Sequence, residues 1–228
     1  MKPVAIIPAR GGSKRIPRKN IADMNGLPML AYPVKAALES GVFSHVIVST
    51  EDQEIKEIAR KYGAEALDRP PELAGDEAFE TEVYKQVLGT LEELPEFFCG
   101  IYPTAILLEP EDFKKSFALF DEKPQSDVIM SVSRYPIHPF KAMEESGEGY
   151  LQMVHPKECL MRSQTYPHYV ASNGTFYWFR TRAFQNNPSY YQKHLRGYEL
   201  PASRAVDIDE PEDLKMARAM LKIKNTAK

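Results

Sequence analysis

The sequence predicts an α/β fold with a doubly wound, mostly parallel sheet. Short apolar runs of strand length alternate with segments whose apolar residues recur at helical spacing, and glycines stand where these helices should end. Parallel strands need long crossover connections, which are usually helices, so this succession is typical of a parallel sheet. The chain has 228 residues, which is enough for one large domain with a buried core.

The first half of the chain shows the alternation most clearly. Val4–Ala9 is a short apolar run closed by Gly11-Gly12, which indicates a buried strand. Pro28–Ser40 carries apolar residues at helical spacing and stops before Gly41, a natural helix end. The next expected elements are a buried strand at His45–Thr50, a helix at Asp52–Tyr62 that ends at Gly63, and a short strand at Ala64–Leu67.

The second half continues the alternation and then interrupts it. The expected elements are a helix at Thr81–Leu94, a strand at Phe97–Tyr102, a helix at Glu109–Phe120, strands at Asp127–Ser133 and Gly174–Arg180, a short apolar segment at Ala205–Ile208, and a final helix at Glu210–Leu221. Pro211 suits the first turn of that last helix, because its missing N–H is not needed there.

Residues 135–171 break the pattern. This segment is irregular and rich in proline, histidine and aromatic residues, with short strands at best, such as Tyr150–Val154. We interpret it as an excursion from the sheet, so residues 1–228 are expected to form a single domain.

Composition excludes several classes of protein. Lys and Arg total 29 against 32 Asp and Glu, a formal charge of −3, which calls for neither nucleic acid nor a membrane surface as a partner. No run approaches the ~20 apolar residues of a membrane span, and no charged leader precedes an apolar core. Two cysteines are too few for a disulfide framework. We therefore expect a cytoplasmic protein.

Basic residues crowd into the loop after the first strand. Gly11-Gly12 allows a sharp turn that presents N–H groups to an anion, and Arg10, Lys14 and Lys19 add cations around it. A triphosphate needs both features, because its charge must be neutralised as the leaving group departs. The patterns GxxxxGK[ST] and GxGxxG do not fit, which argues against a P-loop kinase and a dinucleotide dehydrogenase. The alternative is a solvated basic loop, but open parallel sheets bind ligands at this end of their strands.

Two carboxylates, Asp207 and Asp209, flank Ile208 near the C-terminus. At a strand end, side chains separated by one residue point to the same side, which suits a shared Mg²⁺ ion. Mg²⁺ prefers oxygen ligands and usually also holds substrate phosphates. The alternative is that Asp209, followed by Glu210-Pro211, is only a helix N-cap. A phosphate-binding loop in the same chain favours the metal.

Six short motifs follow one another in order along nearly the whole chain: ARGGSKRIPRKN at 9–20, VSTED at 48–52, RPPELAGD at 69–76, YPT at 102–104, RSQ at 162–164 and DIDEPEDL at 207–214. Together they resemble the acylneuraminate cytidylyltransferase family, whose members activate nonulosonic acids as CMP-sugars. Within that family, the form of the first motif, Tyr102 before Pro103-Thr104, and Arg162-Ser163-Gln164 are more similar to pseudaminic acid cytidylyltransferases than to the sialic acid enzymes.

The resemblance implies a Rossmann-like nucleotidyltransferase that transfers CMP from CTP to a nine-carbon α-keto acid sugar, most closely pseudaminic acid, and releases pyrophosphate. It implies catalytic roles for Arg10, Lys14 and Asp209, and Mg²⁺ bound by Asp209 with support from Asp207. It also implies a homodimer in which the excursion lends residues to the partner's site; the alternative for this segment is a mobile lid. The residues implied to bind the nucleotide are Arg10, Gly11, Gly12, Ser13, Lys14, Lys19, Asn20, Arg69, Thr81 and Thr104. Those implied to bind the sugar are Tyr102, Lys141, Arg162, Gln164, Asn173 and Tyr177.

The sequence also departs from the family pattern. Phe79 and Glu80 occupy places where relatives carry small hydroxyl residues near the nucleotide, which leaves only Thr81 there. Tyr102-Pro103-Thr104 mixes features of the sialic and pseudaminic acid enzymes, and Ser172-Asn173-Gly174 is more similar to the sialic acid form. The alternatives are therefore the same reaction on N-acetylneuraminic, legionaminic or 3-deoxy-octulosonic acid. A non-catalytic nucleotide-binding protein is the alternative of another class.

Overall fold

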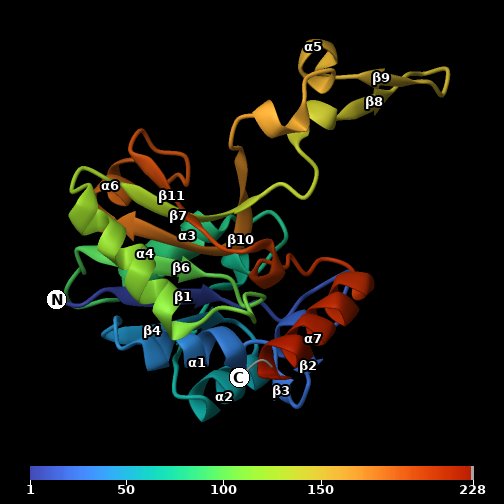
Figure 1. Ribbon diagram of the computed structural model, residues 1–228. Helices are drawn as coiled ribbons and strands as arrows, with labels where there is room; N and C mark the ends of the chain where they lie inside the picture. Colours follow the sequence, from blue (N-terminus) through green and yellow to red (C-terminus); the bar gives the residue numbers. More distant parts are fainter. Residues whose placement is uncertain (227–228) are drawn as a thin grey trace.

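The computed structural model describes residues 1–226 and is organised around one central sheet (Figure 1). Its seven strands follow the order β11-β7-β10-β6-β1-β4-β5. The strands are β1 (Val4–Pro8), β4 (His45–Thr50), β5 (Glu65–Asp68), β6 (Phe97–Ile101), β7 (Val128–Arg134), β10 (Val170–Arg180) and β11 (Leu195–Glu199). Two small hairpins lie outside this sheet: β2 (Asp23–Met24) with β3 (Leu27–Pro28), and β8 (Met143–Glu145) with β9 (Leu151–Met153).

The central sheet is parallel except for β10. Strand β1 pairs in parallel with β4 on one side and with β6 on the other, and β10 runs antiparallel between β6 and β7. From β1 the chain therefore builds outward in both directions, and the strand order reverses between β1 and β6. This arrangement confirms the predicted doubly wound, mostly parallel sheet. A reversal of this kind opens a crevice at the carboxyl ends of the two strands.

Helices cover both faces of the sheet. One apolar cluster joins the sheet to Val34 of α1, Ile55 of α2 and Phe113 of α4, and a second joins the opposite face to Val83 of α3. The α-helices are α1 (Ala31–Ser40), α2 (Gln53–Lys61), α3 (Glu80–Leu88), α4 (Pro110–Glu122), α5 (Pro156–Cys159), α6 (Thr181–Asn186) and α7 (Pro211–Thr226). Short 3₁₀ turns occur at Lys19–Ile21, Pro71–Leu73, Pro139–Lys141, Ser163–Thr165 and Ala202–Arg204.

Helix α7 packs away from the sheet. Its Ala217 and Leu221 join a third apolar cluster with Ile16 from the basic loop and Met24 from the small β2–β3 hairpin. The C-terminal helix thereby braces the loop that follows β1. It extends to Thr226, beyond the predicted end at Leu221, and residues 227 and 228 lie outside the described residues.

Some predicted elements have different bounds in the structure. The helix expected over Thr81–Leu94 is α3, which stops before Gly89, a residue that disfavours helix continuation. Residues 205–209 do not form a strand. The edge position belongs instead to β11, which the sequence analysis missed because an edge strand with alternating polar residues lacks the apolar signature of a buried strand.

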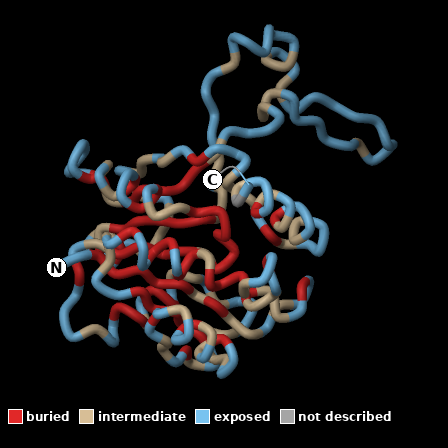
Figure 2. The backbone as a smooth tube through the Cα atoms, turned by 60° about the horizontal axis from the view of Figure 1, so that its bottom comes forward, coloured by how far each residue is buried: buried red, intermediate tan, exposed pale blue. Residues whose placement is uncertain are grey.

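Residues 135–169, here called the arm, project from the body of the molecule (Figure 1). The arm carries the β8–β9 hairpin and α5, and an aromatic cluster stabilises it. The rings of His138 and Tyr169 stack with their centroids 5.0 Å apart, and the ring centroids of Phe140 and Tyr166 are 5.3 Å apart. In Figure 2 the arm is almost entirely exposed, whereas the central strands are buried. Its exposed hydrophobic residues are Tyr135, Ile137, Met143, Tyr150, Leu151, Met153, Val154, Leu160, Met161 and Tyr169.

No described helix has the length and apolar character required to cross a membrane.

Candidate active site

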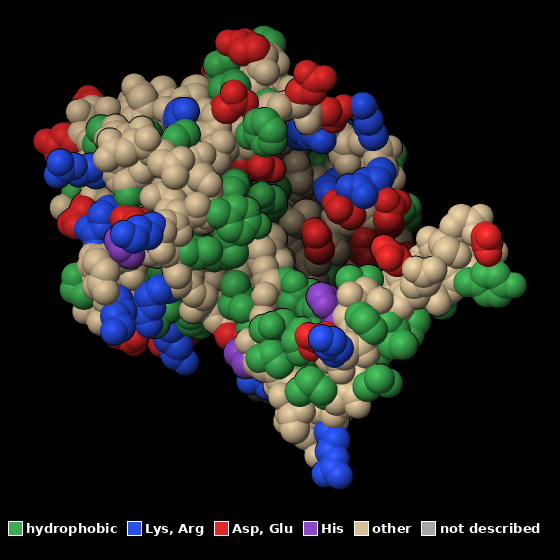
Figure 3. Space-filling model, turned by 90° about the horizontal axis from the view of Figure 1, so that it is seen from above, with side chains coloured by type: hydrophobic (Ala, Val, Ile, Leu, Met, Phe, Trp, Pro, Cys, Tyr) green, Lys and Arg blue, Asp and Glu red, His purple; other side chains and the backbone are tan. Residues whose placement is uncertain are grey.

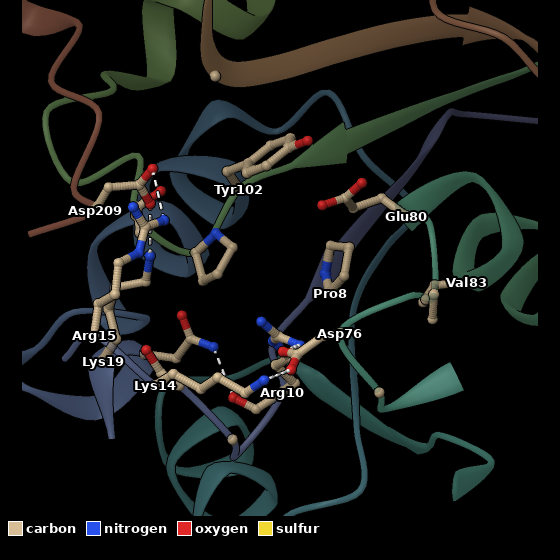
Figure 4. A pocket seen from close by; sticks show the side chains of 18 of the residues that line it. Pro8, Arg10, Lys14, Arg15, Lys19, Asp76, Glu80, Val83, Tyr102 and Asp209 are labelled. Carbon is tan, nitrogen blue, oxygen red and sulfur yellow. Dashed lines mark hydrogen bonds and ion pairs between the residues drawn. The ribbon is translucent and has the colours of Figure 1, made fainter. Parts of the chain in front are cut away.

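A cavity of about 840 Å³ lies at the crevice between β1 and β6 (Figure 4). Pro8 at the end of β1, Tyr102 just after β6, and Tyr177 of β10 all line it. Figure 3 looks onto this end of the molecule and shows a hollow bordered by acidic and basic side chains, with the arm beside it. The cavity is therefore where a doubly wound sheet is expected to bind its ligand.

The basic loop after β1 forms one wall of the cavity. Arg10, Gly12, Ser13, Lys14, Arg15, Lys19 and Asn20 all line it. Buried Asn20 pins the loop, because its side-chain nitrogen donates to the Arg10 carbonyl at 2.9 Å. Gly11 is required by close packing: a Cβ there would lie 2.5 Å from an Asp52 carboxylate oxygen. The Gly11 N–H donates to Glu51 Oε1 at 2.7 Å. The amide nitrogen of Gly11 is thus already hydrogen-bonded within the protein.

The cations of this loop are held by carboxylates. Arg10 Nη1 lies 2.7 Å from Asp76 Oδ1, and Lys14 also pairs with Asp76. Hydrogen bonds from Lys14 and Arg10 hold the pKa of Asp76 below its ordinary value. Lys19 Nζ lies 3.3 Å from Asp209 Oδ1. A phosphate group entering the cavity must therefore displace acidic side chains from the cations that receive it.

Two further arginines of the same loop behave differently from each other. Arg15 reaches toward the cavity and pairs with Asp209 at 2.9 Å and with Glu210 at 3.0 Å. Arg18 pairs instead with Asp52, the N-cap of α2, and with Glu54. The basic residues of this loop therefore have two different roles. Most of them line the cavity, whereas Arg18 anchors the loop to α2.

Arg69 follows β5 and is buried, with only 7% of its surface exposed. Its Nη2 donates to the Ser49 carbonyl at 2.6 Å and its Nε to Ser49 Oγ at 3.3 Å. Burial lowers the pKa of Arg69, and the carboxylates of Glu51 and Glu80 oppose that shift. Because β4 holds the guanidinium in place, Arg69 presents a fixed donor to the cavity.

Asp207 and Asp209 both line the cavity, and Asp209 lies on the opposite side from Glu80 at the start of α3 (Figure 4). Burial, reinforced by the charge of Asp209, raises the pKa of Asp207. The N-cap alternative for Asp209 fails, because among residues 1–226 its carboxylate accepts no helix N–H and pairs instead with Arg15 and Lys19. A cation that binds Asp209 in the cavity must therefore take the place of these two side chains.

This acidic pair suits a metal ion shared with phosphate. Among residues 1–226 no group of three or more His, Cys, Asp or Glu side chains could hold a metal by itself. Mg²⁺ does not need such a group, because it is usually bound through one or two carboxylates together with substrate phosphates. Asp207 and Asp209 supply that number of carboxylates opposite a cationic loop, so the residues present fit Mg²⁺.

Tyrosines line the inner wall. The rings of Tyr102 and Tyr177 lie 5.9 Å apart, and the Tyr177 hydroxyl is 2.6 Å from Ser172 Oγ. Burial raises the pKa of both phenols. Gly174, which also lines the cavity, has φ +62°, and the register of β10 against β7 shifts here. Neutral hydroxyls and ring faces on this wall suit a polyhydroxylated substrate.

The cavity lining includes most of the residues proposed from the sequence. Arg10, Gly12, Ser13, Lys14, Lys19, Asn20, Arg69, Tyr102, Thr104, Tyr177, Asp207 and Asp209 all line it. Gly11 and Thr81 are adjacent in sequence to lining residues but are not part of the lining. Asn173 uses its side chain within the fold, accepting from Ser131 Oγ at 2.8 Å and donating to Ser133 Oγ at 3.0 Å.

Lys141, Arg162 and Gln164 belong to the arm and do not line this cavity. All three are exposed. Lys141 instead lines a second cavity of about 660 Å³ between the arm and the end of β7, with Arg134 and His168. Within a single copy of the chain, the arm residues and the main cavity are thus separate.

Sequence reasoning missed other lining residues, notably Pro8, Arg15, Asp76, Glu80 and Ser172. Arg15 and Asp76 both belong to the motifs quoted from the sequence, and their charge was a signal that could have identified them as lining residues. Glu80 was visible as a departure from the family pattern.

Comparison with known proteins gives a consistent result. The family model described as "Cytidylyltransferase" matches residues 4–226. A pseudaminic acid cytidylyltransferase of Campylobacter jejuni is 35% identical over 98% of this chain and 97% of the relative. An N-acylneuraminate cytidylyltransferase of Streptococcus agalactiae is 30% identical over 93% of this chain, which corresponds to 52% of that longer protein. A solved CMP:2-keto-3-deoxy-manno-octonic acid synthetase complexed with CTP superposes with a TM-score of 0.74, covering 98% of this chain and all of that one; at 19% identity it shows a shared fold.

Proposed function

The chain belongs to the cytidylyltransferase family, and from this premise we propose that it transfers CMP from CTP to a nonulosonic acid, most closely pseudaminic acid, and releases pyrophosphate. One observation carries the proposal: the cavity at the β1–β6 crevice sets the cations of the basic loop against the Asp207–Asp209 pair. The near full-length identity to a pseudaminic acid cytidylyltransferase supports the choice of sugar.

The nucleotide end of the reaction belongs to the loop after β1. Arg10, Lys14 and Lys19 hold the triphosphate. Its phosphate oxygens take the place of the Asp76 and Asp209 carboxylates as ion-pair partners of these cations. Cytidylyltransferases of this family generally work with a divalent metal ion. We assign Mg²⁺ to Asp207 and Asp209, where it would supply positive charge to the phosphates.

The chemical step joins the sugar to the α-phosphate. The anomeric hydroxyl oxygen of the sugar forms a bond to the α-phosphorus and loses its proton to solvent, the bond from that phosphorus to the bridging oxygen breaks, and pyrophosphate leaves with the electron pair. Arg10 and Lys14 offset the charge that develops on the α-phosphate and the leaving group. Positioning and charge stabilisation supply most of the rate, as in other phosphoryl transfers.

The sugar end involves the tyrosine wall and, in this proposal, a second copy of the chain. Tyr102 and Tyr177 contact the sugar within one copy, and Asn173 shapes the adjoining bend of β10. Lys141 and Arg162 provide cations for the sugar carboxylate, but they sit on the arm. We therefore propose a homodimer in which the arm carries these residues, with Gln164, to the partner's cavity. The exposed hydrophobic side chains of the arm support this arrangement.

Pyrophosphate release tests the function directly. The protein is incubated with CTP, Mg²⁺ and one sugar acid at a time: pseudaminic, legionaminic, N-acetylneuraminic or 3-deoxy-octulosonic acid. We expect the fastest release with pseudaminic acid. A faster rate with another sugar acid would reassign the substrate, and release with none of them would refute the transferase proposal. Light scattering tests the dimer separately, and a monomer at assay concentration would refute the arm exchange.

A further inference from the structure

Glu80 lines the cavity at the end away from Asp209. In Figure 4 its carboxylate points into the cavity above Pro8, while Lys19 and Asp209 occupy the other side. The surrounding apolar surface comes from Pro8, Leu73, Ala78 and Val83, which all line the cavity. Such a site suits a flat, largely apolar ring that carries polar groups on its edge.

Among residues 1–226 the Glu80 carboxylate has no hydrogen bond and no ion pair. A purely structural role for Glu80 would be to interact favourably with the helix dipole, as an acidic residue in the first turn of α3. Glu82 already serves the start of this helix, because its Oε2 accepts the backbone N–H of Phe79 at 3.1 Å. Glu80 is thus free to accept a hydrogen bond from a ligand in the cavity.

Arg69 supplies the complementary donor at the same end. Its Nε and Nη2 donate to Ser49, whereas Nη1 donates to no acceptor within the described residues. The charges of Arg69 and Glu80 are close enough to influence each other. A buried, fixed donor and an acceptor without a partner therefore border one apolar site.

We propose that Glu80 accepts a hydrogen bond from the 4-amino group of cytosine, while Arg69 donates to the O2 and N3 edge, so that this pair selects CTP over UTP. The inference rests on the proposed function. Cytosine carries a donor at position 4, whereas uracil carries an oxygen acceptor there. A carboxylate facing that oxygen meets lone pairs instead of a proton, and both groups stay unpaired in a partly desolvated site.

The test is base selectivity in the Glu80→Gln variant. Pyrophosphate release is measured with CTP and with UTP, each with the sugar acid that the wild-type protein prefers. The side-chain amide of glutamine can turn its NH₂ group toward uracil O4. The wild-type protein should prefer CTP strongly, and the kcat/KM ratio of CTP to UTP should fall by about 10-fold or more in the variant. Glu80→Ala should lower the same ratio by reducing activity with CTP.

Glu82→Gln is the matched control. It removes the same charge from the same helical turn, its amide oxygen can still accept the Phe79 N–H, and it lies outside the cavity lining. Its CTP to UTP ratio should equal that of the wild type. Circular dichroism and calorimetric titration with CTP alone establish that each variant is folded and binds nucleotide without the sugar.

Other results would overturn the inference. An unchanged CTP to UTP ratio in both Glu80 variants would do so. A changed kcat/KM ratio of CTP to dCTP with base selectivity intact would also overturn it, because Glu80 would then act on the ribose. An effect confined to the KM of the sugar acid would overturn it as well. Failure of the wild-type protein to use any nucleotide would instead refute the proposed function, and would be seen before any Glu80 variant is assayed.

Discussion

The ammonium group of Lys19 lies 3.3 Å from the carboxylate of Asp209, across 190 residues of sequence. Its Nζ also donates to the Ile208 carbonyl at 2.7 Å. Lys19 thus ties the basic loop after β1 to the acidic segment before α7, so that the groups assigned to phosphate and to metal meet in one cavity. Separation of these two segments would abolish the site even if every other element remained folded.

Asp209→Ala should reduce the rate of CMP transfer by at least ~100-fold, because it removes a proposed ligand of the metal that would stabilise charge on the phosphates. The measurement is pyrophosphate release at saturating CTP and Mg²⁺, with circular dichroism to establish folding. Glu212→Ala is the control, because Glu212 is exposed and its one ion pair within residues 1–226 is with Lys215 on the same helix. Equal rates for the Asp209 variant and the wild type would remove Asp209 from the site.

Asp76→Asn should lower the KM for CTP by about 2- to 10-fold, since Arg10 and Lys14 no longer have to exchange a carboxylate for phosphate. Steady-state kinetics with varied CTP measure the effect. The neighbouring Glu77→Gln removes an exposed charge outside the cavity lining and should leave this KM unchanged. A raised KM in Asp76→Asn would mean that Asp76 helps to bind the nucleotide instead of competing with it.

Arg162→Ala should raise the KM for the sugar acid far more than the KM for CTP, because its guanidinium is assigned to the sugar carboxylate of the partner's site. Separate titrations of the two substrates distinguish the effects. Lys157→Ala changes another exposed cation of the arm and serves as the control. Equal increases in both KM values would contradict the role given to Arg162.

Gly100→Ala should destabilise the protein by about 1–3 kcal/mol, the usual cost of overpacking a core. A Cβ at this position in β6 would lie 2.3 Å from the hydroxyl oxygen of Tyr84, a fully buried residue of α3. Urea unfolding can be followed by the fluorescence of Trp178, the single tryptophan, which is also fully buried. Gly147→Ala, where a Cβ meets nothing within 4 Å, should change the free energy of unfolding by less than about 0.5 kcal/mol.

Asp112→Ala should cost about 3 kcal/mol of stability, because it leaves the charge of Arg204 without its main partner. Arg204 makes two hydrogen bonds to buried Asp112, at 2.6 and 3.0 Å, and thereby holds the chain after β11 against α4. The comparison is Glu122→Ala, which breaks the more exposed pair with Arg196 and should cost no more than about 1 kcal/mol. Similar losses in the two variants would show that the Asp112–Arg204 pair contributes no more than a surface pair.

The agreement between the residues proposed from the sequence and the cavity lining depends on the motif. Most of the proposed residues of the loop after β1 line the cavity, because they directly follow a buried strand whose end lies at the crevice. Glu80 and Asp76 were not selected, since they come from the connection between β5 and α3, where nothing periodic indicates which side chains face inward. Lys141 and Arg162 were assigned to the sugar by resemblance alone, and the arm separates them from the cavity of their own chain.

Most local elements could be predicted from the sequence alone: the buried strands and helices with clear apolar periodicity, the helix ends near Gly41 and Gly63, and the basic loop after the first strand. These features depend on interactions between near neighbours in the chain, so they can be predicted from spacing. Only the tertiary structure decided that β10 inserts antiparallel between β6 and β7, that Asp76 pairs with the loop cations, and that Glu80 faces the same cavity as Arg69. Such contacts join residues far apart in sequence, and packing of the whole sheet sets their distances.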